Sequence, residues 1–206
     1  MSGAAAVAVH PWPAAQQAAA LALTEQGLAV IGVALDVAAT RDVARHSIRH
    51  ALADTLALAC HCPLAQVQLR SEPAQPVRVT LPGYRLAVSL SHETGLSLAA
   101  IRVGGAVGVD LMRIDQDLDW EPVARLYLGA SVSAEIGRKS RSLQAYFFAQ
   151  VWTAWEASLK CCGLAISEWS PALAGTLAQC RVQALEVPAG FAGSVAVLDE
   201  ALSPAL

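Results

Sequence analysis

Three polar side chains share one stripe of a helix predicted over Arg141–Cys162. Trp152, Glu156 and Lys160 are spaced four residues apart, so on a helix they lie one above the other. A Glu followed four residues later by a Lys stabilises a helix by a few tenths of a kcal/mol, and that structural role is the simplest explanation. A neighbouring apolar stripe predicts the core-facing side of the helix. The polar stripe therefore lies at the edge of the core, where a carboxylate and an ammonium could converge on a cleft.

Asp110 is the second candidate, because it interrupts an apolar strand predicted over Ala106–Met112. A buried carboxylate without a partner is costly, so Asp110 must pair with a cation, accept hydrogen bonds or bind a metal ion. The structural alternative is an ion pair with an arginine such as Arg113 or Arg125.

Ser91 and His92 follow a strand predicted over Leu86–Leu90. A hydroxyl and an imidazole at a strand end can both contact a phosphate or a carboxylate. The alternative is a polar turn with a surface histidine.

The elements that must position these residues alternate between strands and long helices. A β-branched strand over Leu28–Val37 leads, through Thr40 as a helix cap, into a helix over Arg41–Cys60. Turn residues then separate short segments that favour an antiparallel sheet. These segments are Val67–Arg70, Val77–Thr80, Leu86–Leu90 and Leu96–Val103. Gly163 ends the second long helix, and strands are predicted over Arg181–Val187 and Ser194–Leu198.

The two halves of the chain resemble each other. Ile31–Asp36 (IGVALD) and Val107–Met112 (VGVDLM) are similar strands that each precede a long helix, although Ala- and Val-rich units also match by chance. We expect an α+β fold in which residues 1–103 and 104–206 form one compact, pseudo-twofold unit with antiparallel sheets. Clefts between such halves favour ligand sites. A two-halved chain needs no partner subunit to complete its cleft, so we expect a monomer.

Composition excludes several classes of function. The 206 residues are 55% hydrophobic and only 15% charged, with a formal net charge of −3, so a general nucleic-acid binder with its basic face is excluded. Polar residues such as Glu25 and Asp36 interrupt the most apolar stretch before it reaches the roughly 18 residues of a spanning helix. The N-terminus lacks the cationic start of a secretory signal. We expect a cytoplasmic protein that does not bind membranes.

The five cysteines do not have the spacing of a disulfide framework. Cys60-His61-Cys62 and Cys161-Cys162 lack the two-residue gap of common zinc sites, and small buried thiols are the competing interpretation. A cysteine acyltransferase is disfavoured because no paired base follows a convincing pattern.

Together the three polar segments resemble a known family. Ser91-His92, Gly108-Val109-Asp110 and the helical pattern W-T-x-x-E-A-x-x-K-x-x-G from Trp152 to Gly163 look like the motifs of the 4'-phosphopantetheinyl transferases. The resemblance is to the two-halved type that activates peptide and polyketide synthetases, and it spans roughly residues 40 to 165. Such enzymes move the phosphopantetheine arm of coenzyme A to a serine of an apo carrier protein and release adenosine 3',5'-bisphosphate.

The resemblance implies a role for each candidate. Asp110 and Glu156 would hold Mg²⁺, and Glu156 would also be the general base. Lys160 would contact the pyrophosphate as a point charge.

At the nucleotide end of coenzyme A, the resemblance implies that Ser91 and His92 would hold the 3'-phosphate. Arg49 or Arg45, on the first long helix, could reach the same end of the cofactor.

The sequence also departs from the family. Met112 stands where many members have a second acid, Trp155 replaces the usual lysine before the motif glutamate, and Gln75 replaces another lysine. These departures keep a second hypothesis open: a catalytically degenerate relative that binds coenzyme A or a carrier protein as a scaffold. Asp110 and Glu156 separate the two hypotheses, because binding alone needs no metal.

Overall fold

Two four-stranded sheets form the centre of the computed structural model, which describes residues 5–71 and 76–199. The first sheet has the order β2 (His10–Pro11), β3 (Leu28–Ala34), β7 (Leu96–Val103), β6 (Leu86–Glu93). The second has the order β1 (Val7–Ala8), β9 (Arg181–Glu186), β10 (Phe191–Asp199), β8 (Gly105–Arg113). A separate hairpin joins β4 (Gln68–Arg70) and β5 (Arg78–Thr80).

The inner faces of the two sheets share one apolar core. Val30 and Leu98 of the first sheet pack in the same buried cluster as Val109 and Val195 of the second. Successive side chains of a strand point to opposite faces, so the inward direction of Val109 sends Asp110 to the outer face of its sheet. Asp110 therefore lies on the outer face of the second sheet.

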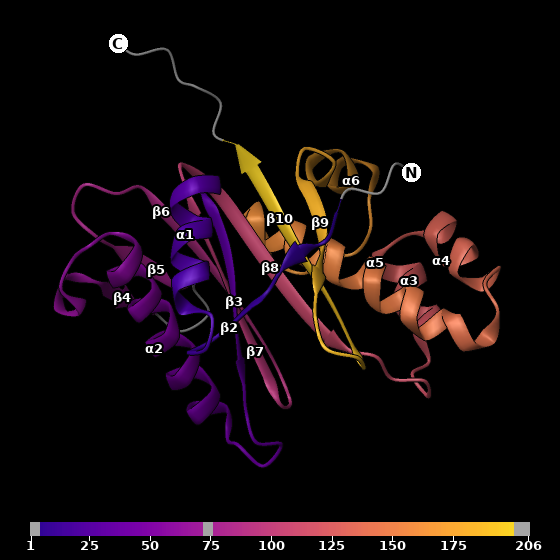
Figure 1. Ribbon diagram of the computed structural model, residues 1–206. Helices are drawn as coiled ribbons and strands as arrows, with labels where there is room; N and C mark the ends of the chain where they lie inside the picture. Colours follow the sequence, from indigo (N-terminus) through magenta and orange to yellow (C-terminus); the bar gives the residue numbers. More distant parts are fainter. Residues whose placement is uncertain (1–4, 72–75, 200–206) are drawn as a thin grey trace, which may run out of the picture.

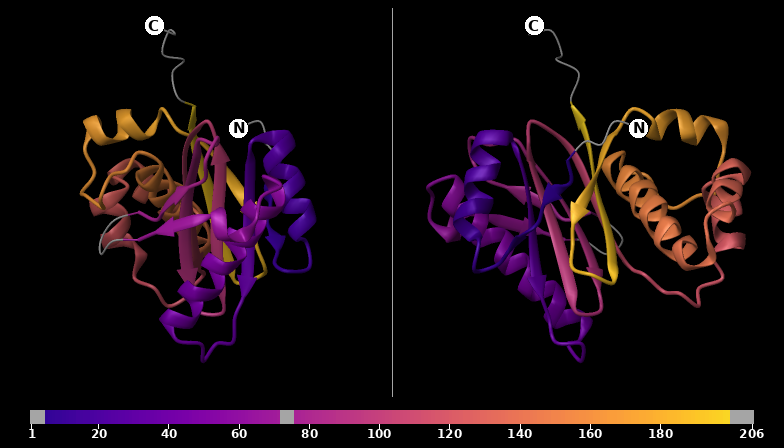
Figure 2. Two further views of the ribbon diagram at one scale, coloured as in Figure 1. Left: turned by 90° about the vertical axis from the view of Figure 1, so that its left-hand side faces the viewer. Right: turned by 45° about the vertical axis from the view of Figure 1, so that its right-hand side comes forward.

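Helices cover the two outer faces, giving four layers (Figures 1 and 2). The first sheet is covered by α1 (Gln16–Gln26) and α2 (Arg41–Ala59), and η1 (Leu64–Gln66) follows α2. The second sheet is covered by α5 (Arg141–Cys161), beside which lie α3 (Trp120–Tyr127), α4 (Ala130–Gly137) and α6 (Pro171–Leu177). Within residues 5–71 and 76–199, no helix has both the length and the hydrophobicity needed to cross a membrane.

The halves repeat the same topology. In the first half β3 pairs with β7 and β7 with β6, and in the second half β8 pairs with β10 and β10 with β9, all antiparallel. Residues 31–36 and 107–112 lie on and just after the corresponding strands β3 and β8. The predicted α+β class with two similar halves is thereby confirmed.

The N-terminal segment links the two halves. The strand β1 runs parallel to β9 in the second sheet, and β2 runs parallel to β3 in the first. Gly104, near which the sequence placed the division, lies between β7 and β8.

Several predicted elements differ from the observed ones. The first long strand ends at Ala34, because the Asp36 carboxylate accepts the Ala38 N–H at 2.8 Å and turns the chain. The short segments between residues 67 and 103 form a hairpin and one edge of a sheet rather than one sheet. The helices α1, α3, α4 and α6 were not predicted. Thr40 does cap α2, as predicted, by accepting the Val43 N–H at 3.3 Å.

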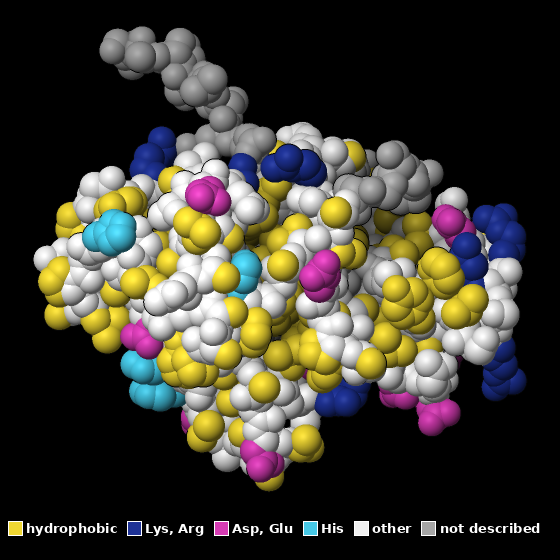
Figure 3. Space-filling view, viewed as in Figure 1, with side chains coloured by type: hydrophobic (Ala, Val, Ile, Leu, Met, Phe, Trp, Pro, Cys, Tyr) yellow, Lys and Arg dark blue, Asp and Glu magenta, His cyan; other side chains and the backbone are white. Residues whose placement is uncertain are grey.

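Figure 3 shows how thinly charged side chains are spread over one face of the molecule. A local cluster of charges is therefore an informative feature in this protein.

Candidate functional site

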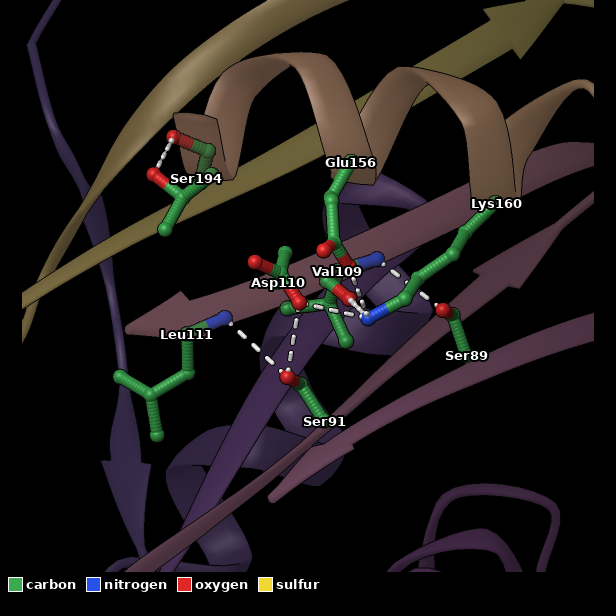
Figure 4. A network of polar contacts seen from close by, with 9 residues as sticks. Ser89, Ser91, Val109, Asp110, Leu111, Glu156, Lys160 and Ser194 are labelled. Carbon is green, nitrogen blue, oxygen red and sulfur yellow. Dashed lines mark hydrogen bonds and ion pairs between the residues drawn. The ribbon is translucent and has the colours of Figure 1, made fainter. Parts of the chain in front are cut away.

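The two sheets meet edge to edge where β6 lies beside β8, a junction that we call the seam. Three side chains of β6 accept backbone N–H groups of β8: Ser89 from Val109 at 3.0 Å, Ser91 from Leu111 at 3.1 Å, and Glu93 from Arg113 at 3.1 Å. Figure 4 shows the first two of these contacts. Side-chain oxygens thus satisfy donors that an unpaired strand edge would leave exposed.

Asp110 finds its partner on α5 rather than in an arginine. Lys160 Nζ lies 2.6 Å from Asp110 Oδ1 and also donates to the Val109 carbonyl at 3.1 Å. Ser91 donates its hydroxyl proton to the same Oδ1 at 2.9 Å. Asp110 is only 5% exposed, and these donors offset the cost of burying its carboxylate.

The two arginines suggested as partners of Asp110 are engaged elsewhere. Arg113 donates to the Thr94 carbonyl at 2.6 Å and lies over the Phe191 ring. Arg125 pairs with Glu121, which is on its own helix, at 2.6 Å.

Glu156 brings a second carboxylate to the same lysine. Its Oε2 is 3.7 Å from Lys160 Nζ, so the ammonium lies between two carboxylates from different elements (Figure 4). Burial raises the pKa of Glu156 above its ordinary value, and the nearby Asp110 carboxylate raises the pKa further. A carboxylate with a raised pKa is better suited to take up a proton.

Gly108 explains why α5 can approach so closely. A Cβ at this position would stand 1.9 Å from the Ala157 carbonyl oxygen and 2.5 Å from the Cys161 nitrogen. Both atoms are backbone, so no side-chain rotation could relieve the contact. The glycine in β8 therefore permits the short packing distance between β8 and α5 that brings Glu156 and Lys160 close to Asp110.

A cleft of about 1180 Å³ opens beside the seam, between α2 and the end of α5. Arg41, Arg45 and Arg49 line it from one face of α2, together with His92 and Lys160. Arg45 has Asp42 at 3.8 Å, in a pair exposed to solvent. The Arg49 Nε is buried and has no hydrogen-bond partner among the described residues.

The arginine stripe includes one residue that sequence reasoning missed. Arg41 lies four residues before Arg45, as Arg45 lies four before Arg49, so the helical period alone could have identified it.

Ser91 and His92 act on opposite sides of the seam. Ser91 faces Asp110, whereas His92 lies across the hairpin from Ser97, with its Nδ1 2.9 Å from the Ser97 hydroxyl. Neighbouring residues of a strand point to opposite faces, which separates the two side chains. Of the two, His92 is the one that lines the arginine cleft.

Burial, followed by the positive charges of Arg45, Arg41 and Lys160, lowers the pKa of His92 from 6.5 to about 4. The unfolded chain takes up this proton as the pH falls through 6.5, but the folded protein does so only near pH 4. The stability that neutral His92 contributes is present above pH 6.5 and is lost between pH 6.5 and 4.

We expect the urea midpoint of the protein to fall more steeply between pH 7 and 4.5 than that of His92→Gln. His46→Gln, an exposed histidine on α2, is the matched control and should keep the wild-type slope. Equal slopes for the wild type and His92→Gln would contradict the assignment.

A smaller cleft of about 580 Å³ adjoins the first and contains the two carboxylates. Met112 lines it, so the place of the missing second acid is apolar. Trp155 instead packs in a buried cluster against Tyr127 and Trp152 and is not among the residues that line the two clefts. Gln75 lies outside the described residues.

The donor set suits a hard, largely hydrated cation. Asp110 and Glu156 supply carboxylate oxygens, and Mg²⁺ is commonly held by one or two carboxylates plus water. No group of three or more His, Cys, Asp or Glu side chains that could hold a metal occurs in the described part of the chain. As a pair of oxygen ligands, Asp110 and Glu156 suit Mg²⁺, with Lys160 as its competitor for Asp110.

The cysteines do not form a nucleophilic site. Burial raises the pKa of Cys60, Cys161 and Cys162, that of Cys162 to about 11, which disfavours the reactive thiolate. The Cys162 and Cys180 sulfurs are 3.5 Å apart, and both thiols are free.

Comparison with protein families gives one finding. Residues 106–189 match the family model of the 4'-phosphopantetheinyl transferase superfamily, which confirms the resemblance at the level of the superfamily. The matched segment, less than half of the chain, contains Asp110, Glu156 and Lys160 but neither Ser91 nor His92. The comparison with curated proteins gives no match.

Proposed function

We propose, from this superfamily match, that the protein transfers the phosphopantetheine arm of coenzyme A to a serine hydroxyl of an apo carrier protein. The observation that carries the proposal is the Asp110–Lys160–Glu156 group, which lies directly beside a cleft lined by arginines. A donor with a pyrophosphate and a separate nucleotide phosphate needs these two features next to each other.

The charges of the larger cleft support a nucleotide at that end. Three arginines and Lys160 line it, in a protein whose net charge is −3. A cleft of about 1180 Å³ is somewhat larger than the roughly 300–1,000 Å³ of ordinary small-molecule sites, and so has room for a ligand as large as coenzyme A. We therefore assign the adenosine 3'-phosphate to the arginine stripe and the pyrophosphate to the seam near Lys160, which lines both clefts.

Transfer requires a serine hydroxyl of the carrier to attack the phosphorus that bears the pantetheine arm. Glu156 takes the hydroxyl proton, a new P–O bond forms, and the bond to the departing adenosine 3',5'-bisphosphate breaks. Lys160 stabilises the negative charge on the pyrophosphate oxygens. Mg²⁺ held by Asp110 and Glu156 would supply further charge neutralisation at this pyrophosphate.

The proposal is tested by incubating the protein with coenzyme A, Mg²⁺ and a panel of apo carrier proteins drawn from fatty-acid, polyketide and peptide synthesis. We expect at least one carrier to gain the mass of one phosphopantetheine arm. The same carrier with its acceptor serine replaced by alanine should gain nothing, and chelation of Mg²⁺ should abolish the reaction reversibly. If a folded sample modifies no carrier, the transferase assignment is wrong.

Met112 favours a second candidate, in which the protein binds coenzyme A or a carrier without turnover. An apolar side chain in the smaller cleft replaces a carboxylate that would bind metal. Tight binding of coenzyme A by calorimetry, with no carrier modified, would support this scaffold role over transfer.

We expect Arg49→Gln to raise the KM for coenzyme A by about tenfold or more with little change in kcat, because a charged hydrogen bond contributes about 1.5–3 kcal/mol. The measurement is steady-state kinetics with coenzyme A and with dephospho-coenzyme A, which lacks the 3'-phosphate. The difference between the wild type and Arg49→Gln should vanish with dephospho-coenzyme A. Arg138→Gln, at an exposed arginine, is the control. If the wild type and Arg49→Gln differ as much in KM for dephospho-coenzyme A as for coenzyme A, the assignment of the phosphate to Arg49 is wrong.

A further inference from the structure

The seam uses side chains where an ordinary sheet uses backbone carbonyls. Each of the three contacts joins residues separated by 20 positions, so the offset between β6 and β8 stays constant along the seam. The side-chain oxygens of Ser89, Ser91 and Glu93 thus hold the register between the two halves.

Ser91 differs from Ser89 in a second contact. Both hydroxyls accept a backbone N–H of β8, but among the described residues only Ser91 also donates to a carboxylate, Asp110 Oδ1 at 2.9 Å. A hydroxyl has one proton and two acceptor lone pairs. Because Asp110 takes the proton of Ser91, this hydroxyl has no proton to offer a phosphate.

Of the two donors to Asp110 Oδ1, Ser91 is the more constrained. The Ser91 oxygen is held by the Leu111 N–H and is buried, with 6% of the residue exposed. The Lys160 side chain is 33% exposed and has a flexible four-carbon stem, and its ammonium divides its contacts among Asp110, Glu156 and the Val109 carbonyl. The orientation of Asp110 therefore depends on Ser91.

We propose that Ser91 is a positioning residue, which holds the Asp110 carboxylate in the orientation that the site requires, and not a contact to the 3'-phosphate. The effect of Ser91 on catalysis rests on the proposed function. Its effect on the orientation of Asp110 does not, because that orientation is a property of the free protein.

Three variants distinguish a positioning role of Ser91 from a role in the stability of the fold alone: Ser91→Ala, Ser91→Thr and Ser89→Ala. Both alanine variants deprive a buried N–H of its acceptor, so we expect similar decreases in the urea midpoint. Only Ser91→Ala removes a donor from Asp110. Its kcat should fall by about 10- to 100-fold with the KM for coenzyme A within about twofold, because loss of an outer contact to a ligand typically costs that much. Ser91→Thr, which keeps the hydroxyl, should restore most of the kcat.

Two measurements need no turnover. Mn²⁺ binding, followed by electron paramagnetic resonance, should weaken about tenfold or more in Ser91→Ala and stay within about twofold of the wild type in Ser89→Ala. In crystal structures of the free variants, the Asp110 carboxylate should be rotated or disordered in Ser91→Ala and unchanged in Ser89→Ala.

Three outcomes overturn the proposal. A raised KM for coenzyme A, at unchanged kcat and Mn²⁺ affinity, would assign Ser91 to the phosphate. Identical behaviour of the two alanine variants would reduce the contact to a structural one. An unchanged Asp110 in the Ser91→Ala crystal structure would overturn the positioning role. This result can be obtained even if the wild type modifies no carrier, which would overturn the proposed function alone.

Discussion

We expect replacement of Glu156 by glutamine to lower kcat by about 10²- to 10⁴-fold, because the amide can neither accept the serine proton nor supply an anionic oxygen to Mg²⁺. Glutamine has nearly the same shape, so the packing of α5 should persist. The carboxylate lies 3.7 Å from Lys160 and has a raised pKa, as a group that takes up a proton requires. Asp110→Asn should be comparably severe, because Lys160 then loses its ion pair at 2.6 Å.

The measurement is the rate of carrier modification at saturating coenzyme A and carrier, with circular dichroism and urea unfolding to establish the fold. Glu135→Gln, on the exposed surface of α4, serves as the matched control and should keep wild-type kcat. Full activity of Glu156→Gln would eliminate Glu156 both as the base and as a necessary metal ligand.

Gly108→Ala is expected to destabilise the fold by about 3 kcal/mol or more, at or beyond the upper end of ordinary overpacking effects. The new Cβ would lie 1.9 Å from one backbone atom of α5 and 2.5 Å from another, so the helix must shift as a unit. Because α5 carries Glu156 and Lys160, any folded fraction should also lose most of its kcat.

Urea unfolding and steady-state kinetics on the same preparation test both effects. Gly175→Ala is the control, since this glycine lies in α6 with open space around its Cβ position. There alanine should be neutral or stabilise by up to about 1 kcal/mol. Wild-type stability in Gly108→Ala would show that α5 does not depend on the close approach to β8.

Local patterns predicted many of the regular elements of the chain. The strand Leu96–Val103 was predicted with its observed bounds, and both long helices were predicted to within one residue at their ends. These segments have strong periodicity, a capping residue such as Thr40 or a terminating glycine such as Gly163. The helix α1 was missed because four of its 11 residues are alanine and its faces differ little in polarity.

The candidate site was predicted in its residue types but not in its contacts. Asp110 was expected to need a partner, yet Lys160, 50 residues away, was not named as that partner. Ser91 and His92 were assigned one shared role, although the alternation of a strand sends them to opposite sides of the seam. Arg41 was overlooked, although the spacing of α2 includes it with Arg45.

By itself, the sequence determined the two long helices and most of the strands, and it showed that a few charges interrupt an otherwise apolar chain. It also indicated two similar halves. Periodicity and helix caps depend on a few neighbouring residues, so they can be recognised in the sequence before the fold is known. Only the tertiary structure decided which charges meet. The seam brings Ser91 to Asp110 across 19 residues of chain, and the missing Cβ of Gly108 lets α5 lower Glu156 and Lys160 onto the same carboxylate. That convergence depends on the packing distance between a strand and a helix, which no local pattern encodes.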